Sequence, residues 1–215
     1  MRNVEKDEIE MAERRVRMLD AGFRAFAERG IEAVSMQDVA DESGLGIATV
    51  YRYFNAKSAL VVAIGARMWA QFYSEVEREY ARCRGDQMSA AEELDFYLTS
   101  YVVLYRGHRD ILRFNQNFNG YVRHEALSDE MLRDYYAAIE PFTQKFHRLY
   151  EKGLRDGTIR TDVPERTMFH TSMHIMLAVC GRYAQGVVVH SGEPEDLTRE
   201  LMLLKRMILR EYVVE

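Results

Sequence analysis

The sequence is poor in cysteine and proline and has no long apolar run, and each shortage excludes a class of protein. It contains two cysteines and three prolines among 215 residues, which is too few cysteines for a disulfide-rich fold. We therefore expect free thiols in a cytoplasmic protein. No apolar segment approaches the roughly 18 residues that a membrane-spanning helix needs, so we expect no membrane partner.

The sequence also lacks the patterns that mark catalytic sites. It has no evident set of nucleophile and base, no glycine-rich phosphate loop and no cluster of metal ligands. His170 and His174 lie one helical turn apart and could hold a metal, but residues 167–181 supply no acidic residue or further histidine. Hydrogen bonds to a ligand, or packing in an interface, are favoured for this pair. We expect no enzymatic activity, no cofactor and no bound metal.

Acidic residues are absent from one long stretch of the chain. The net charge of −5 argues against a nucleic-acid partner, but no Asp or Glu occurs between Glu42 and Glu75, whereas Arg52 does. A buried helix explains part of this stretch. For residues 43–58 we favour a surface that is kept free of negative charge because phosphate approaches it.

Apolar residues recur at helical spacing along the chain and no strand pattern occurs, so we expect an all-α fold. Gly30 and Gly44 stand where helices end with a left-handed residue. Pro141 should kink or split the helix that contains it. The expected helices span residues 5–29, 35–44, 47–54, 57–80, 89–106, 109–122, 129–154, 165–189 and 195–213.

A short segment near the N-terminus has the spacing of a helix-turn-helix. Ser35 can cap the first helix, with Asp38 at the capping-box position. Ala40 is small enough for the two helices to cross, and Gly44 tolerates the left-handed turn between them. Val50 packs the second helix on the first. The pattern predicts a second helix that lies in the major groove of double-stranded DNA.

At these positions the sequence resembles the TetR family of regulators, over residues 17–61. The matching residues are Phe23, Phe26, Gly30, Ser35, Gly44, Thr49, Val50, Tyr51, Tyr53, Phe54, Lys57 and Leu60. The resemblance implies a three-helix helix-turn-helix DNA-binding domain at residues 1–58. It also implies a larger helical domain for effector binding and dimerisation at residues 59–215, where only the helix layout is similar.

The family's DNA contacts can be carried over position by position. The resemblance implies that Thr49 and Tyr51 face DNA, and that Tyr53 and Lys57 reach backbone phosphates. Arg52 could read guanine or pair with phosphate, and both possibilities stay open. The residues implied to approach base edges are Gln37, Gly46, Ile47 and Ala48. The full predicted DNA-binding set is Ser35, Gln37, Gly46, Ile47, Ala48, Thr49, Tyr51, Arg52, Tyr53 and Lys57.

Two C-terminal helices are apolar over most of their surface. Residues 167–181 contain no charged residue, and the helix expected at 195–213 carries a broad apolar face. In the TetR family these two helices pair with their twins in a four-helix interface. The resemblance therefore implies a homodimer and a roughly palindromic operator. The predicted interface residues are Met176, Leu201, Leu204 and Ile208.

The middle helices are rich in aromatic residues, methionines and amides. An aromatic stripe at helical spacing is more often core than pocket, but the resemblance implies an effector cavity in this region, apolar with a few polar anchors. The residues predicted to line it are Tyr97, Tyr101, Phe114, Asn117, Phe118, Tyr135, Phe142, Met173 and His174.

Taken together, these features predict a cytoplasmic, DNA-binding transcription regulator. The favoured form is a repressor that a small, largely apolar effector removes from DNA by shifting its conformational equilibrium. The alternative is a TetR-like DNA-bound factor that recruits a protein partner or shapes DNA, without a small-molecule effector. An effector found in an apolar cavity would separate the two.

Overall fold

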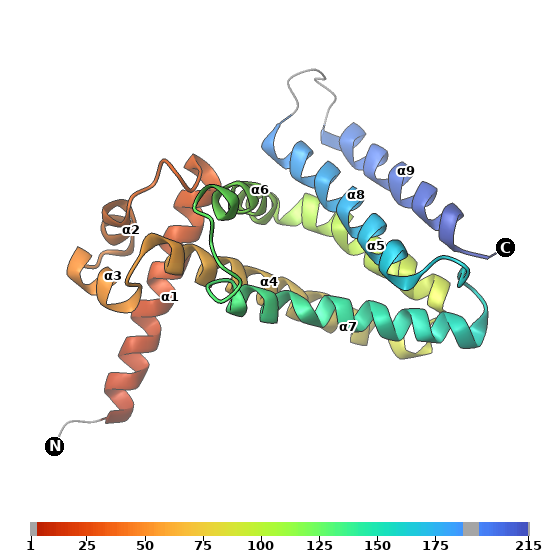
Figure 1. The fold of residues 1–215 in the computed structure, drawn as a ribbon, viewed down its shortest axis with the longest axis horizontal. Helices are drawn as coiled ribbons and strands as arrows, with labels where there is room; N and C mark the ends of the chain where they lie inside the picture. Colours follow the sequence, from red (N-terminus) through yellow and green to blue (C-terminus); the bar gives the residue numbers. More distant parts are fainter. Residues whose placement is uncertain (1–3, 187–193, 215) are drawn as a thin grey trace. The chain divides into compact units, whose positions relative to one another are not determined.

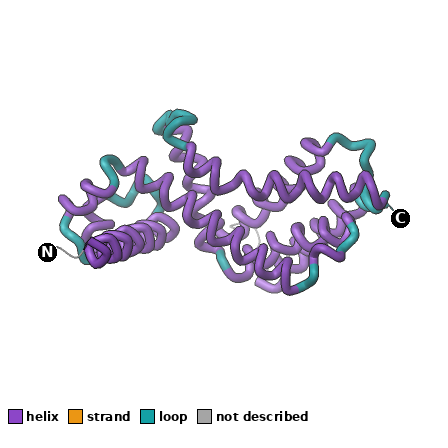
Figure 2. Tube along the Cα trace, turned by 90° about the horizontal axis from the view of Figure 1, so that it is seen from below, coloured by secondary structure: helices purple, strands orange, loops and turns teal. Residues whose placement is uncertain are grey.

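The computed structural model describes residues 4–186 and 194–214, and it is helical, as predicted (Figure 1). Short loops join the helices (Figure 2). Among the described residues, the one strand-like feature is an isolated antiparallel bridge between Ile159 and Val213. The helices are α1 (Val4–Arg29), α2 (Met36–Ser43), α3 (Ile47–Tyr53), α4 (Lys57–Arg82), α5 (Ala90–Gly107), α6 (Arg109–His124), α7 (Arg133–Asp156), α8 (Glu165–Gln185) and α9 (Pro194–Tyr212), with a short 3-10 turn, η1 (Gly85–Gln87).

The chain divides into two compact units. The first unit comprises residues 1–68 and 113–138, and the second comprises residues 69–112 and 139–215. Helices α4, α6 and α7 therefore contribute residues to both units. The division into domains at residue 58 stays a prediction.

The first unit is built on close contacts between short helices. Ala40 and Val50, the residues predicted to lie where α2 and α3 meet, are fully buried, which confirms that prediction. A β-carbon added at Gly22 of α1 would lie 2.8 Å from Ile64 Cδ1 of α4. A glycine at this position thus lets α1 and α4 approach each other.

In the second unit, α5, α8 and α9 pack on one another (Figure 1). Their shared core includes Leu98, Met176 and Leu201, all almost completely buried. Lys205 of α9 is also buried, and its Nζ donates to Asp95 Oδ1 at 2.8 Å and to the Thr99 hydroxyl at 3.1 Å. Because both oxygens belong to α5, this lysine ties α9 to α5 without leaving a buried charge unpaired.

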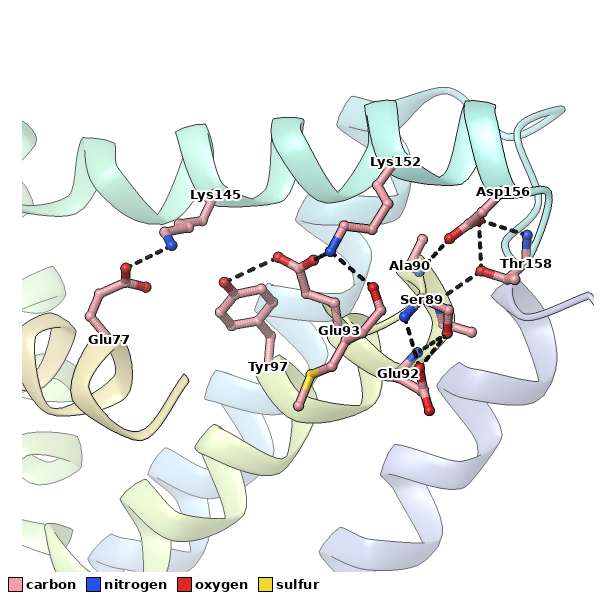
Figure 3. Close-up of polar contacts among 12 residues, drawn as sticks. Glu77, Ser89, Ala90, Glu92, Glu93, Tyr97, Lys145, Lys152, Asp156 and Thr158 are labelled. Atoms are coloured by element: carbon pink, nitrogen blue, oxygen red, sulfur yellow. Dashed lines mark hydrogen bonds and ion pairs between the residues drawn. The ribbon is translucent and has the colours of Figure 1, made fainter. Parts of the chain in front are cut away.

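A second set of polar contacts ties α7 to the start of α5 (Figure 3). The Lys152 ammonium pairs with the Glu93 carboxylate and also donates to the Met88 carbonyl at 3.1 Å. The Asp156 carboxylate accepts from the Ala90 amide at 2.8 Å. Free amides at a helix N-terminus need acceptors, so the end of α7 helps to cap α5.

Pro141 does not split its helix, so that part of the prediction is wrong: α7 is continuous from Arg133 to Asp156. A proline removes one amide donor, the one that would bond the carbonyl four residues earlier. That residue is Ala137, which is exposed, so water can bond to its carbonyl instead.

The two cysteines are free, as predicted. Cys83 is exposed and Cys180 is buried, and burial raises the pKa of the Cys180 thiol to about 12. No helix in the ranges 4–186 and 194–214 is long and apolar enough to cross a membrane.

Candidate nucleic-acid interface and effector region

Helix α2 is held at both ends by the predicted capping residues. The Asp38 amide donates to Ser35 Oγ at 3.1 Å, and the Asp38 carboxylate accepts from the Ser35 amide at 2.7 Å, which completes the capping box. The Ser35 hydroxyl and the Ser35 amide both donate to the Asp38 carboxylate, and these two hydrogen bonds lower the pKa of Asp38. Gly44 closes the helix with φ of 66°, a conformation that favours glycine. The turn that aims α3 is therefore defined by local chemistry, and Ser35 acts here as a cap.

Helix α3 has a buried inner side and an open outer side. Val50 is fully buried on the inner side, whereas Tyr51 is 51% exposed on the outer side. Ala48 and Arg52 are also exposed, and Thr49 is half-buried. Of five further predicted DNA-binding positions, Ser35, Gln37 and Gly46 are exposed, and Ile47 and Tyr53 are half-buried. The segment from Gly46 to Tyr53 thus presents side chains outward, which a groove-reading helix needs.

The outer side of α3 carries positive charge and no acid. Residues 43–58 contain no Asp or Glu, and the Arg52 guanidinium lies 5.9 Å from the centre of the Tyr53 ring. Sequence reasoning did not identify Arg15 of α1, whose guanidinium lies 5.4 Å from the centre of the buried Phe54 ring. The sequence did contain a signal of positive charge on α1, because this helix carries four arginines between positions 14 and 24. Arg15 adds a cation beside the C-terminal end of α3.

Two predicted DNA-binding side chains have partners within the chain. The Lys57 ammonium donates to the Glu32 carbonyl at 3.3 Å and lies 5.9 Å from the centre of the Tyr121 ring. Its partial burial lowers the pKa of Lys57. The Gln37 amide donates to the Asp41 carboxylate at 2.7 Å. Each side chain keeps further donor hydrogens, so it can still bind a phosphate or a base while it holds its partner.

Four of the predicted effector residues lie in the first unit. The Phe114, Phe118 and Tyr135 rings form a series, with ring centres 5.9 Å and 4.5 Å apart. Phe114 and Phe118 are almost fully buried, and Asn117 is half-buried. A β-carbon at Gly65 would lie 3.1 Å from the Tyr135 ring. These rings therefore pack tightly in the core of this unit.

The other five predicted effector residues lie in the second unit, in three places. Phe142 contacts the aromatic rings of α4, and Tyr97 of α5 lies beside Tyr80. Tyr101 lies where its carbonyl accepts from the buried Cys180 thiol at 3.5 Å. Met173 is half-buried on α8, and His174 is exposed and stacks on His170 with ring centres 5.5 Å apart.

Sequence reasoning missed the residues of α4 that accompany Phe142 and Tyr97. Trp69, Phe72 and Tyr73 bring rings within 6.4 Å of the Phe142 ring, centre to centre. Their spacing along α4 was a signal that could have identified these rings as inward-facing, but nothing in the sequence paired them with α7. The missed polar residues are Glu77, Tyr80, Glu93, Lys145 and Lys152.

The predicted interface residues are mostly part of the chain's own core. Met176 and Leu201 are fully buried and Ile208 is nearly so, while Leu204 is half-buried. Among the described residues of these two helices, the large apolar side chains that are exposed are Ile175 on α8 and Leu203 and Met207 on α9, the last two 51% and 59% exposed. We name these three residues the α8–α9 face.

Comparison with known proteins identifies the N-terminal region and the fold. Residues 18–64 match the model of the bacterial regulatory proteins of the tetR family. The repressor KstR2 of Rhodococcus jostii is 25% identical over 73% of this chain and 72% of its own length. The repressor AcnR of Corynebacterium diphtheriae is 25% identical over 93% of both chains.

A similar solved structure is FadR from Bacillus subtilis in complex with stearoyl-CoA. It has a TM-score of 0.68 and 16% identity, and the match covers 91% of this chain and 95% of that one. This likeness shows the fold. The family match falls on the capped α2, the Gly44 turn and the outward-facing α3. Residues 18–64 therefore form the DNA-binding region of a bacterial regulatory protein of the tetR family, and over most of its length the chain is similar to transcriptional repressors.

Proposed function

We propose that the protein is a homodimeric repressor that binds a roughly palindromic operator in the cytoplasm and is released by a small effector with a largely apolar body. The observation that carries the DNA-binding part is the outer side of α3, where Tyr51 and Arg52 are exposed and acids are absent. The relatives KstR2 and AcnR are both repressors, which supports repression over activation.

The α8–α9 face supports the dimer. Large apolar side chains exposed together on neighbouring helices mark an interaction surface. Here Leu203 and Met207 lie one turn apart on α9, and Ile175 is exposed on α8, which packs against α9. A second copy of the chain is the occupant that we propose, because a two-fold axis would place two copies of α3 on successive half-sites.

The accessible aromatic side chains of the second unit support an effector. Tyr73, Tyr80, Tyr97 and Phe142 are each only half-buried, as expected for rings that line a binding site. FadR, which shares the fold, was solved with a long-chain acyl-CoA. A ligand that binds the DNA-incompetent conformation more tightly would shift the population away from DNA.

The proposal is tested by selecting DNA that binds the purified protein from a random library and then measuring its release. We expect a palindromic consensus, and we expect at least one ligand with a large apolar body to weaken binding by tenfold or more, about 1.4 kcal/mol of differential affinity. Fluorescence anisotropy of the labelled duplex measures both quantities. Binding that no ligand weakens would favour a DNA-bound factor that recruits a protein partner.

A further inference from the structure

Glu77 of α4 has one oxygen with a partner and one without. Its Oε2 pairs with the Lys145 ammonium of α7 at 2.6 Å (Figure 3). Its Oε1 is buried and has no hydrogen-bond partner among the residues that the structure describes. A buried acceptor that lacks a donor costs free energy, whereas the same acceptor with a donor does not. The Oε1 atom is therefore a vacant acceptor.

The charges around this acceptor are balanced. Lys145 and Lys152 extend from α7 towards the carboxylates of Glu77 and Glu93, and each ammonium pairs with one of them (Figure 3). The Lys145 ammonium also lies 4.5 Å from the centre of the Tyr80 ring. A ligand whose charged group lay at Glu77 Oε1 would disturb this balance and would lose its hydration.

Aromatic rings continue from this polar cluster along α4 and α7. Tyr73 lies one helical turn before Glu77, and Phe142 lies one turn before Lys145. The Tyr73 and Phe142 ring centres are 5.0 Å apart, and both side chains are half-buried. On the other side of the cluster, Tyr80 stacks on Tyr97 with ring centres 5.9 Å apart. Accessible rings thus flank a vacant acceptor.

We propose that this site binds an uncharged amphiphile whose hydroxyl group donates a hydrogen bond to Glu77 Oε1 and whose apolar body lies against Tyr73 and Phe142. This inference rests on the proposed function, because it names the chemical class of the effector. A hydroxyl satisfies the vacant acceptor without adding charge, whereas a ketone of the same shape cannot donate. The site should therefore distinguish an alcohol from its ketone.

Trp69 provides a direct readout of binding. It is the only tryptophan in the sequence, it is buried, and its ring centre lies 6.0 Å from that of Phe142. A body that binds against Phe142 should change the fluorescence of Trp69. The probes are cyclododecanol, cyclododecanone and the cyclododecylammonium ion, which differ only in the polar group.

The wild-type protein should bind cyclododecanol about tenfold more tightly than cyclododecanone, because only the alcohol donates to the carboxylate. It should also bind the alcohol more tightly than the cation. In Glu77→Gln, the amide oxygen can still accept a hydrogen bond from the Lys145 ammonium. The amide nitrogen then takes the place of Oε1 and is a donor, not an acceptor. The preference for the alcohol should vanish or reverse in that variant.

The matched control is Glu140→Gln, an exposed position on α7, which should keep the wild-type preference. Equal affinities for the alcohol and the ketone in the wild type, or no binding of the alcohol, would overturn the inference. So would tightest binding of the cation, or an unchanged preference in Glu77→Gln. Release of operator DNA by some other ligand would leave the proposed function intact in each of these cases.

Discussion

Replacing Met207 with glutamate should convert the dimer to monomers and weaken operator binding about 100-fold. Met207 is 59% exposed and is the most exposed residue of the α8–α9 face. In a two-fold interface each substitution occurs twice, so two carboxylates would be buried close together without partners. A monomer binds only one half-site. It therefore loses the gain in affinity that a dimer has because its second α3 is already held at a high effective concentration near the second half-site.

Light scattering of the purified variant measures the mass, for which a monomer gives 25.1 kDa. The matched control is Leu154→Glu, because Leu154 is a leucine of α7 with 62% exposure that lies outside the α8–α9 face. It should remain dimeric and bind DNA normally. A Met207→Glu protein that keeps the dimer mass would place the interface elsewhere on the molecule.

Replacing Lys152 with methionine should lower the free energy of unfolding by about 3 kcal/mol, the scale measured when one partner of a buried ion pair is removed. Glu93 is only 3% exposed, while the Lys152 side chain is 22% exposed. The variant therefore leaves a buried carboxylate without its cation and the Met88 carbonyl without its donor. Urea unfolding at fixed protein concentration measures the loss.

The double variant Glu93→Met with Lys152→Met serves as the control for lost packing. Replacing both charges by apolar groups of similar size removes the desolvation penalty together with the attraction, so it should restore much of the stability that Lys152→Met loses. If Lys152→Met costs less than about 1 kcal/mol, the pair behaves as a surface ion pair. Apolar packing would then be the main interaction that stabilises the contact between α7 and α5.

The sequence predicts α2, α3 and the turn between them well because their structure is set by local rules. The Ser35 cap, the left-handed Gly44 and the buried Val50 each follow from residues a few positions apart. Capping, turn and spacing rules act at this range. The prediction that Tyr51 faces outward came from the family resemblance, and its exposure agrees with that role.

Contacts between distant segments could not be predicted in the same way. The sequence identified α9 as broadly apolar, but it could not say which side the chain covers itself. Leu201 and Ile208 turned out to be buried, and Leu203 and Met207 exposed. A helix with a broad apolar face can pack some of its apolar residues in the core of its own chain and leave others exposed for a partner. Which residues of α9 are buried depends on how α5 and α8 pack against it.

The same limit explains the missed polar cluster. Glu77 and Lys145 are 68 positions apart in the sequence, and charged residues on a helix are usually solvated. Nothing local marks Glu77 as a residue with a buried oxygen. The position of α7 against α4 within the second unit brings the two together, and that position follows from the packing of the whole unit.

The central claim is that the outer side of α3 reads DNA, and the affinity of Tyr51→Ala for the selected duplex tests it most directly. Exposed Tyr136 on α7 provides the matched control as Tyr136→Ala. Tyr51→Ala should lose at least about tenfold in affinity, the effect of about 1.4 kcal/mol, while the dimer mass and the Tyr136→Ala affinity stay at wild-type values. If Tyr51→Ala and Tyr136→Ala bind the duplex equally well, α3 does not carry DNA recognition.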